Sequence, residues 1–159
     1  MKNLKKLLLV LLPILTLSLV FSCSNDDDDY DDTIDQDRKN MKFTVTVDGV
    51  DEQDYVSFVF VGADLNNSNT VWKVNGATQN NETAISLDKN DFIGSTKTYV
   101  IESTTPLRLV TTSSQCLNPG ANNPSFKVSF KAEVNGKVVT NDENFTVTST
   151  SDYTHKYDY

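Results

Sequence analysis

The sequence has few of the residues that carry enzyme chemistry. It contains one histidine, His155, and two cysteines, Cys23 and Cys116, among 159 residues. It has no Gly-x-Ser-x-Gly, Cys-x-x-Cys or His-Glu-x-x-His motif and no glycine-rich phosphate loop. The two carboxylates of a hydrolase meet only in space, and no acid here stands in a context that supports such a pair. We therefore expect no enzyme, no catalytic residue and no cofactor.

Basic residues are scarce as well. The chain has 14 Lys and Arg against 22 Asp and Glu, a net charge of −8. A nucleic-acid partner requires a basic surface, so we expect none. The same acidity argues against electrostatic binding to an anionic membrane, so any membrane attachment would depend on lipid.

Helical periodicity is missing after the first 22 residues, and alternation with a period of two takes its place. Apolar residues occupy every second position in 41–47 and again in 126–134, as in half-buried strands. Asn135-Gly136 joins the second run to the next and is a strong hairpin signal. The expected strands are 41–47, 55–62, 70–74, 83–87, 97–103, 107–113, 125–134, 137–140 and 144–150, with one helical turn within 87–94.

This count and spacing predict an all-β fold, a small antiparallel two-sheet sandwich of about 7–9 strands, with a small barrel as the alternative. We expect Trp72 and the apolar side of 126–134 in its core. The pattern resembles an immunoglobulin-like or fibronectin-like domain, in which a Trp on the third strand is often buried. The disulfide of antibody domains is absent.

The first 22 residues differ from the rest of the chain. Three lysines within the first six residues precede an apolar run over 7–21, and Ser22 stands before Cys23. This is the order of a secretory signal peptide. The apolar run is about 15 residues long, whereas a stable membrane span needs about 20, so a transmembrane anchor is the less favoured alternative.

The stretch SLVFSCSN around Cys23 resembles the lipobox of bacterial lipoproteins, in which the cysteine is acylated and becomes the first residue of the mature chain. Val20 and Phe21 depart from the usual pattern and give a looser lipobox, typical of the Bacteroidetes. The residues that follow also resemble the acidic lipoprotein export signal of that group, and an alternative is a solvated acidic spacer. These are Ser24, Asn25, Asp26, Asp27, Asp28 and Asp29. The resemblance implies a lipid anchor on Cys23 in the outer membrane, with the chain exposed at the cell surface.

Three segments follow from this interpretation: a signal peptide over 1–22, a lipidated acidic tether over 23–40 and one β-sandwich domain over 41–159. Removal of the leader removes three lysines and no acid, so the net charge falls from −8 to −11. Within the tether, Asp32-Thr33-Ile34 resembles the O-glycosylation motif of Bacteroidetes secreted proteins, which implies a modified Thr33.

Lipidation of Cys23 would leave Cys116 without a partner in the chain. Cys116 stands in the run 113–124, which is typical of a loop, and we expect it to be a small, partly buried apolar filler. A reactive thiol is the alternative. No basic residue lies between Arg108 and Lys127 to lower its pKa.

Two acidic stretches are relevant to calcium. The run 64–69 begins like an EF-hand loop, but Asn69 and Asn75 stand where that loop needs Gly and Glu. An irregular site could use the acids between the first two expected strands, although solvated turn acids are the favoured interpretation and we expect no metal. Those acids are Asp48, Asp51, Glu52 and Asp54.

The tail places Tyr153, His155, Tyr157 and Tyr159 on alternate positions. In an extended strand all four would face one way, and Tyr153, Tyr157 and Tyr159 are then candidate ligand contacts. The favoured alternative is a last edge strand that covers the core.

The function expected from these features is a non-catalytic binding or adhesion module at the cell surface, for a glycan or an envelope protein. The alternative is a structural or accessory subunit of an outer-membrane complex, and a secreted hydrolase is least favoured. A glycan binder should present exposed aromatics near Trp72, Tyr55 or the tail. An accessory subunit should present an apolar patch or a free sheet edge.

Overall fold

The computed structural model describes residues 37–64, 66, 68–120 and 122–159. The predicted signal peptide, the acylated Cys23, the acidic export signal and Thr33 lie outside the described residues. No helix among the described residues is long and apolar enough to cross a bilayer.

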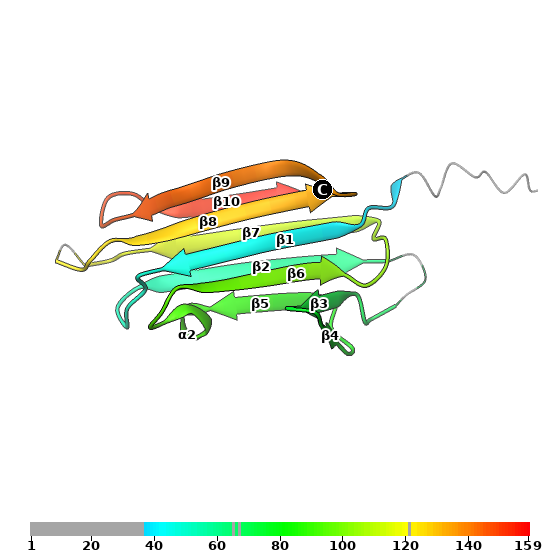
Figure 1. Ribbon diagram of the computed structural model, residues 1–159, viewed down its shortest axis with the longest axis horizontal. Helices are drawn as coiled ribbons and strands as arrows, with labels where there is room; N and C mark the ends of the chain where they lie inside the picture. The colour runs from blue at the N-terminus through cyan, green and yellow to red at the C-terminus, as the bar shows by residue number, and fades with distance from the viewer. Residues whose placement is uncertain (1–36, 65, 67, 121) are drawn as a thin grey trace, which may run out of the picture. The chain divides into compact units, whose positions relative to one another are not determined.

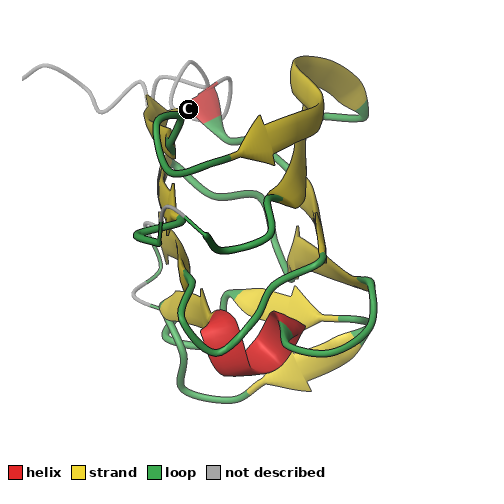
Figure 2. Ribbon diagram, turned by 90° about the vertical axis from the view of Figure 1, so that its left-hand side faces the viewer, coloured by secondary structure: helices red, strands yellow, loops and turns green. Residues whose placement is uncertain are grey.

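Two antiparallel sheets face each other across one core (Figures 1 and 2). The six-stranded sheet has the order β4-β3-β6-β1-β8-β9, and the four-stranded sheet has the order β10-β7-β2-β5. The strands are β1 Met41–Asp48, β2 Tyr55–Ala63, β3 Trp72–Val74, β4 Ala77–Gln79, β5 Ala84–Asp88, β6 Lys97–Ser103, β7 Leu109–Leu117, β8 Phe126–Val134, β9 Lys137–Val147 and β10 Tyr153–Asp158. A short helix, α2 Lys89–Phe92, joins β5 to β6. The predicted all-β sandwich is confirmed, with ten strands instead of about 7–9.

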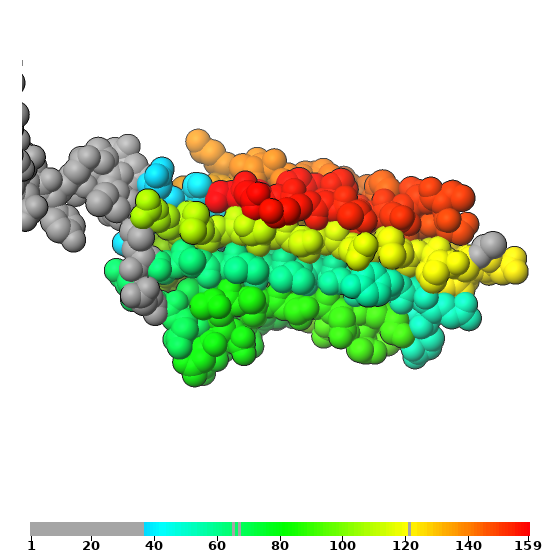
Figure 3. All heavy atoms as spheres, turned by 180° about the vertical axis from the view of Figure 1, so that it is seen from behind, coloured from blue at the N-terminus to red at the C-terminus, as the bar shows by residue number. Residues whose placement is uncertain are grey.

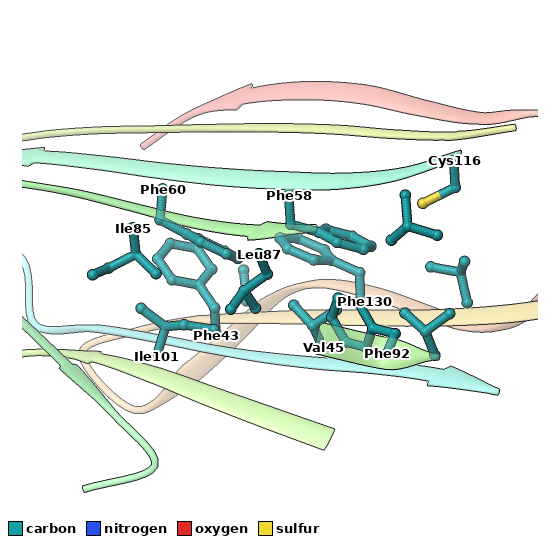
Figure 4. Packing of buried hydrophobic residues seen from close by; sticks show 14 of the residues in the cluster. Phe43, Val45, Phe58, Phe60, Ile85, Leu87, Phe92, Ile101, Cys116 and Phe130 are labelled. Atoms are coloured by element: carbon teal, nitrogen blue, oxygen red, sulfur yellow. The ribbon is translucent and has the colours of Figure 1, made fainter. Parts of the chain in front are cut away.

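The period-two alternation of the sequence directs one side of each long strand into the core. On β1 and β8 the apolar residues are buried, except for the half-buried Val134 at the end of β8, and the polar ones between them are not. Phe43 pairs with Ala132 and Val45 with Phe130 across these strands. The inner faces of both sheets interdigitate in Figure 4, where the Phe43 and Phe60 rings are 5.0 Å apart.

Two strands are longer than the sequence pattern predicts. β7 continues to Leu117, so Cys116 lies on a strand rather than in the predicted loop, with its thiol directed into the core (Figure 4). Cys116 is fully buried, and burial raises the pKa of its thiol to about 12. The filler role is confirmed. β9 runs without a break through both segments that were expected as separate strands.

The strands define two ends of the sandwich. At one end Lys39 exchanges backbone hydrogen bonds with Leu107 just before β1 begins, although the sequence had placed Lys39 in the tether. β1 then runs about 25 Å to the other end. The loop 49–54, the loop 118–125 and α2 lie at that far end, which faces the viewer in Figure 2.

Candidate metal centre

Two buried polar residues flank the place where β2 begins and β7 ends. Tyr55 and Leu117 are the last paired residues of these strands, so Asp54 and Asn118 are the next positions opposite each other. Both side chains lie on the inner face, because they continue the buried alternation of Val56 and Cys116. Directly opposite side chains on one face of a sheet lie within contact distance.

The burial of this pair is unusual for its chemistry. Asp54 is 5% exposed and is the only buried acidic residue in the described part of the chain. Asn118 is 2% exposed and donates its Nδ2 to the Pro124 carbonyl over 2.8 Å. Its Oδ1 is buried and accepts no hydrogen bond from any described residue. Buried acceptors nearly always have a partner, so an unpartnered oxygen at the same strand ends as a buried carboxylate favours an added positive group there.

Asp51 and Asn123 extend the cluster from the two loops. The Asp51 backbone N–H donates to Asp54 Oδ2 over 2.9 Å, and this bond holds the two acids close together. Asn123 Nδ2 lies 3.3 Å from Asp51 Oδ1 and 3.3 Å from Asp54 Oδ1. One neutral donor therefore bridges two carboxylates through two long hydrogen bonds.

The electrostatics of the cluster favour an added cation. Burial raises the pKa of the Asp54 carboxyl above its ordinary value, and the negative charge of Asp51 raises it further. The hydrogen bonds from Asp51 and Asn123 and the charge of Lys89 act in the opposite direction. The raised pKa shows that the donors present do not fully compensate the buried charge.

The structure separates the four acids that the sequence grouped. Thr96 Oγ1 donates to Asp48, and Lys89 Nζ contacts Glu52 Oε2 at 2.9 Å, so these two acids have other partners. Only Asp51 and Asp54 converge. Within the described ranges no three His, Cys, Asp or Glu side chains gather as a metal cluster. A site here therefore depends on carboxamides that sequence reasoning did not select.

Asn118 and Asn123 carried only a weak signal in the sequence, the asparagine-rich loop 118–123. Their position against Asp51 and Asp54 follows from the pairing of β2 with β7, which the sequence does not reveal. Part of the EF-hand-like run 64–69 lies outside the described residues.

The C-terminal tyrosines pack on the core, Tyr153 completely and Tyr157 and Tyr159 in part. Tyr153 is fully buried, and its hydroxyl donates to Asp142 Oδ2 over 2.7 Å. The Tyr157 ring stacks on Phe130 with centroids 5.7 Å apart, and Tyr159 packs on the same core. The prediction of an exposed contact row is wrong for Tyr153, which has no surface to offer a ligand. β10 is instead a last edge strand that covers the core, as the favoured alternative had it.

Exposed aromatics are few elsewhere. Trp72 is fully buried, and its Nε1 donates to the Thr83 carbonyl over 3.0 Å. Tyr55 is 47% exposed and is the one aromatic among the large apolar side chains that stand out from the described surface. The described residues therefore present no group of strongly exposed aromatics around Trp72 or Tyr55, and the tail offers only partly exposed rings.

Solved structures from the Bacteroides group share this architecture. A DUF4425 family protein from Bacteroides ovatus matches with a TM-score of 0.54 and 13% identity, over 77% of this chain and 94% of the other. A DUF4425 domain of unknown function from Bacteroides vulgatus matches with a TM-score of 0.55 and 12% identity, over 77% and 94%. At such identities the likeness is one of fold.

A third similar structure is the calcium-bound form of a protein from Parabacteroides distasonis, solved by NMR. It has a TM-score of 0.53 and 16% identity, over 76% of this chain and 92% of the other. No protein-family model and no curated protein matches the sequence.

Proposed function

We propose that the chain is a non-catalytic surface domain that binds a calcium ion through Asp51, Asp54, Asn118 and Asn123. The proposal rests on the buried Asn118 Oδ1, which has no partner among the described residues and follows the β7 end that pairs with the start of β2, next to Asp54 in the chain. Calcium prefers hard oxygen ligands, and it combines a few carboxylates with carboxamide and backbone carbonyl oxygens and water. The calcium-bound protein of similar fold supports this choice of ion.

Calcium would join the two loops of the far end. Asp51 and Asp54 belong to the loop before β2, whereas Asn118 and Asn123 belong to the loop after β7. A half-turn of the Asn123 carboxamide would exchange its bridging donor for an oxygen ligand. An ion held by both loops would order the end of the domain opposite Lys39 and Leu107.

A calcium titration of the full-length protein tests this proposal. We expect calcium, added after chelation with EGTA, to raise the melting temperature by several degrees, because a ligand at about 100 times its Kd stabilises by about 2.7 kcal/mol. Asp54→Asn should abolish that shift. It should leave the calcium-free melting temperature unchanged or higher, because it removes a poorly compensated buried charge.

The matched control is Asp48→Asn, which removes an acid of the same end that lies outside the cluster. A second variant, Asn118→Asp, should strengthen calcium binding by adding a carboxylate and should weaken the calcium-free fold. The proposal fails if millimolar calcium leaves the wild-type melting temperature unchanged. It also fails if Asp48→Asn and Asp54→Asn reduce the calcium shift equally.

We further propose that the domain is held at the outer face of the outer membrane by acylated Cys23. The support is the resemblance of the leader to Bacteroidetes lipoproteins, together with neighbours of similar fold from Bacteroides and Parabacteroides. Mass spectrometry of the purified protein should find residues 1–22 removed and Cys23 acylated. An intact leader or a free Cys23 thiol would refute the anchor.

We also propose that the domain has no catalytic role. Supporting it is a shallow groove of about 280 Å³ on the outer face of the six-stranded sheet, where Glu102 and Glu133 alternate with Lys42 and Lys73. Lys42 Nζ lies 3.6 Å from Glu102 Oε1, so this acid is paired with a base. Acids interleaved with lysines favour a neutralised surface over an acid–base pair.

Between the two partner classes, the structure favours an envelope protein over a glycan. The described surface has no group of strongly exposed aromatics, whereas β5 and β4 end their sheets and leave edges open. A free edge is the feature expected of a protein-binding or accessory module. The resemblance to immunoglobulin-like domains stays a prediction.

A further inference from the structure

The four edge strands of the sandwich differ in how they are protected against pairing with strands of other molecules. On one side, β9 and β10 face each other across the two sheets, and the hydroxyls of Tyr153 and Tyr157 both reach Asp142 there. The pairing of β9 with β8 also contains two register shifts, so this edge is irregular. On the other side, β4 has only three residues. Short, irregular or covered edges are common defences against unwanted strand pairing.

The remaining edge, β5, has none of these defences. It spans five residues and pairs only with β2, so one side of its backbone has no strand partner. Its sequence, AISLD, contains no Lys and no Pro, and it shows no bulge against β2. Ala84, Ser86 and Asp88 are exposed, while Ile85 and Leu87 point into the core.

A groove runs beside this edge. It has a volume of about 490 Å³ and lies between β5 of one sheet and β3, β4 and β6 of the other. In Figures 1 and 3 the β4 region and α2 project on either side of β5 and bound this stretch. β5 is about 17 Å long, so the space fits an extended segment of about five residues.

The lining of the groove has one sign of charge. Glu82 and Asp91 line it, and no Lys or Arg does. Tyr99 contributes an aromatic wall and donates its hydroxyl to the Asp91 carbonyl over 3.2 Å. An acidic groove along an open strand edge suits a strand that alternates apolar and basic side chains.

We infer that β5 is a docking edge, which an extended basic segment of a partner protein joins as an additional antiparallel or parallel strand. The inference rests on the proposed role as a protein-binding module and names its surface and the chemistry of its partner. Backbone hydrogen bonds to β5 would supply affinity, and Glu82 and Asp91 would select basic side chains.

A peptide of ten alternating valines and lysines tests this inference on the full-length protein. Hydrogen exchange should slow about tenfold at the amides of β5 when the peptide is added. Ala84→Lys should abolish this protection, because a lysine on the edge repels the peptide and blocks pairing. Ser113→Lys is the matched control, since it places the same charge on the exposed face of the central strand β7 and should change nothing.

Three outcomes would overturn the inference. The first is protection of β9 or β10 in place of β5. The second is equal binding of a valine–glutamate peptide, which would remove the role of the acidic lining. The third is concentration-dependent protection of β5 without peptide, which would make the edge a contact between copies of this chain. Running each arm with calcium and with EGTA keeps failure of the edge distinct from failure of the calcium site.

Discussion

At the scale of single residues, close packing determines which substitutions the core accepts. Gly62 lies on β2, where the side chains of Trp72 and Leu107 fill the space beside it. A Cβ at this position would lie 2.7 Å from Leu107 Cδ1 and 2.7 Å from Trp72 Cζ2. Both neighbours are fully buried and have no room to move, so this glycine is required by a close approach.

We therefore expect Gly62→Ala to lower the free energy of unfolding by about 1–3 kcal/mol, the usual range for overpacking a core. Urea denaturation measures the change. Ser57→Ala on the same strand is the control and should change stability by less than about 0.5 kcal/mol. An unchanged midpoint for Gly62→Ala would mean that Trp72 and Leu107 repack freely.

The raised pKa of Asp54 leads to a second prediction at the residue scale, that the stability of the fold depends on pH. Its folded pKa is raised above its ordinary value of 3.8, so without calcium the folded state binds the proton more tightly. Its contribution to stability is then present below the unfolded pKa and is lost as the pH rises through the raised folded pKa. Calcium needs the ionised carboxylate, so the calcium-induced rise in melting temperature should grow over that same range.

Melting curves with and without calcium, from about pH 4 to about pH 8, measure this dependence. Plotted against pH, the melting temperatures with and without calcium should diverge as the pH rises and should then differ by a constant amount. In Asp54→Asn they should coincide throughout. A calcium effect that is constant across this range would show that Asp54 does not coordinate the ion.

At the scale of elements, two hairpins have the same kind of Asn-Gly turn. Asn135 and Gly136 have φ angles of 50° and 77°, and Asn75 and Gly76 have 49° and 81°, as type I′ turns require. Each asparagine also ties its turn to a neighbouring segment. The Asn40 N–H donates to Asn135 Oδ1 over 2.8 Å, and the Val100 N–H donates to Asn75 Oδ1 over 2.8 Å. These bonds help to set the register of the six-stranded sheet.

Gly136→Ala should therefore lower the free energy of unfolding by about 1–2 kcal/mol, the penalty for a side chain in the left-handed region. The cause would be conformational, because a Cβ at Gly136 meets nothing within 4 Å. Urea denaturation should give a similar loss for Gly76→Ala. A loss of about 3 kcal/mol or more for either variant would show that the turn has packing partners beyond these contacts.

At the scale of the whole molecule, the described domain has distinct ends. The chain joins the sandwich beside Lys39 and Leu107, and the candidate calcium centre lies at the opposite end of β1. The chain therefore enters the domain at one end, and the loops of the proposed calcium site lie at the other. The β5 edge runs along the side of the sandwich between these ends.

The prediction at this scale concerns the acidic run after Cys23 and the exposure of the protein at the cell surface. Replacing Asp26, Asp27, Asp28 and Asp29 with alanine should leave acylation and the melting temperature unchanged, because these residues precede the domain. The variant should lose its exposure at the cell surface. Protease shaving of whole cells measures that exposure, and equal digestion of variant and wild type would refute the export role.

The sequence alone determined the fold class and much of the core, because apolar alternation and turn residues are local signals. It predicted the buried faces of β1 and β8, the burial of Trp72 and the Asn135-Gly136 hairpin. Only the tertiary structure decided which face of the tail is buried and which loops meet. Tyr153 alternates as an exposed row would, but its contacts with Asp142 and the core place it inside. Asp54 and Asn118 are 64 positions apart in the chain. Their loops lie at the same end because β2 pairs with β7, and strand order is a non-local property that no local pattern encodes.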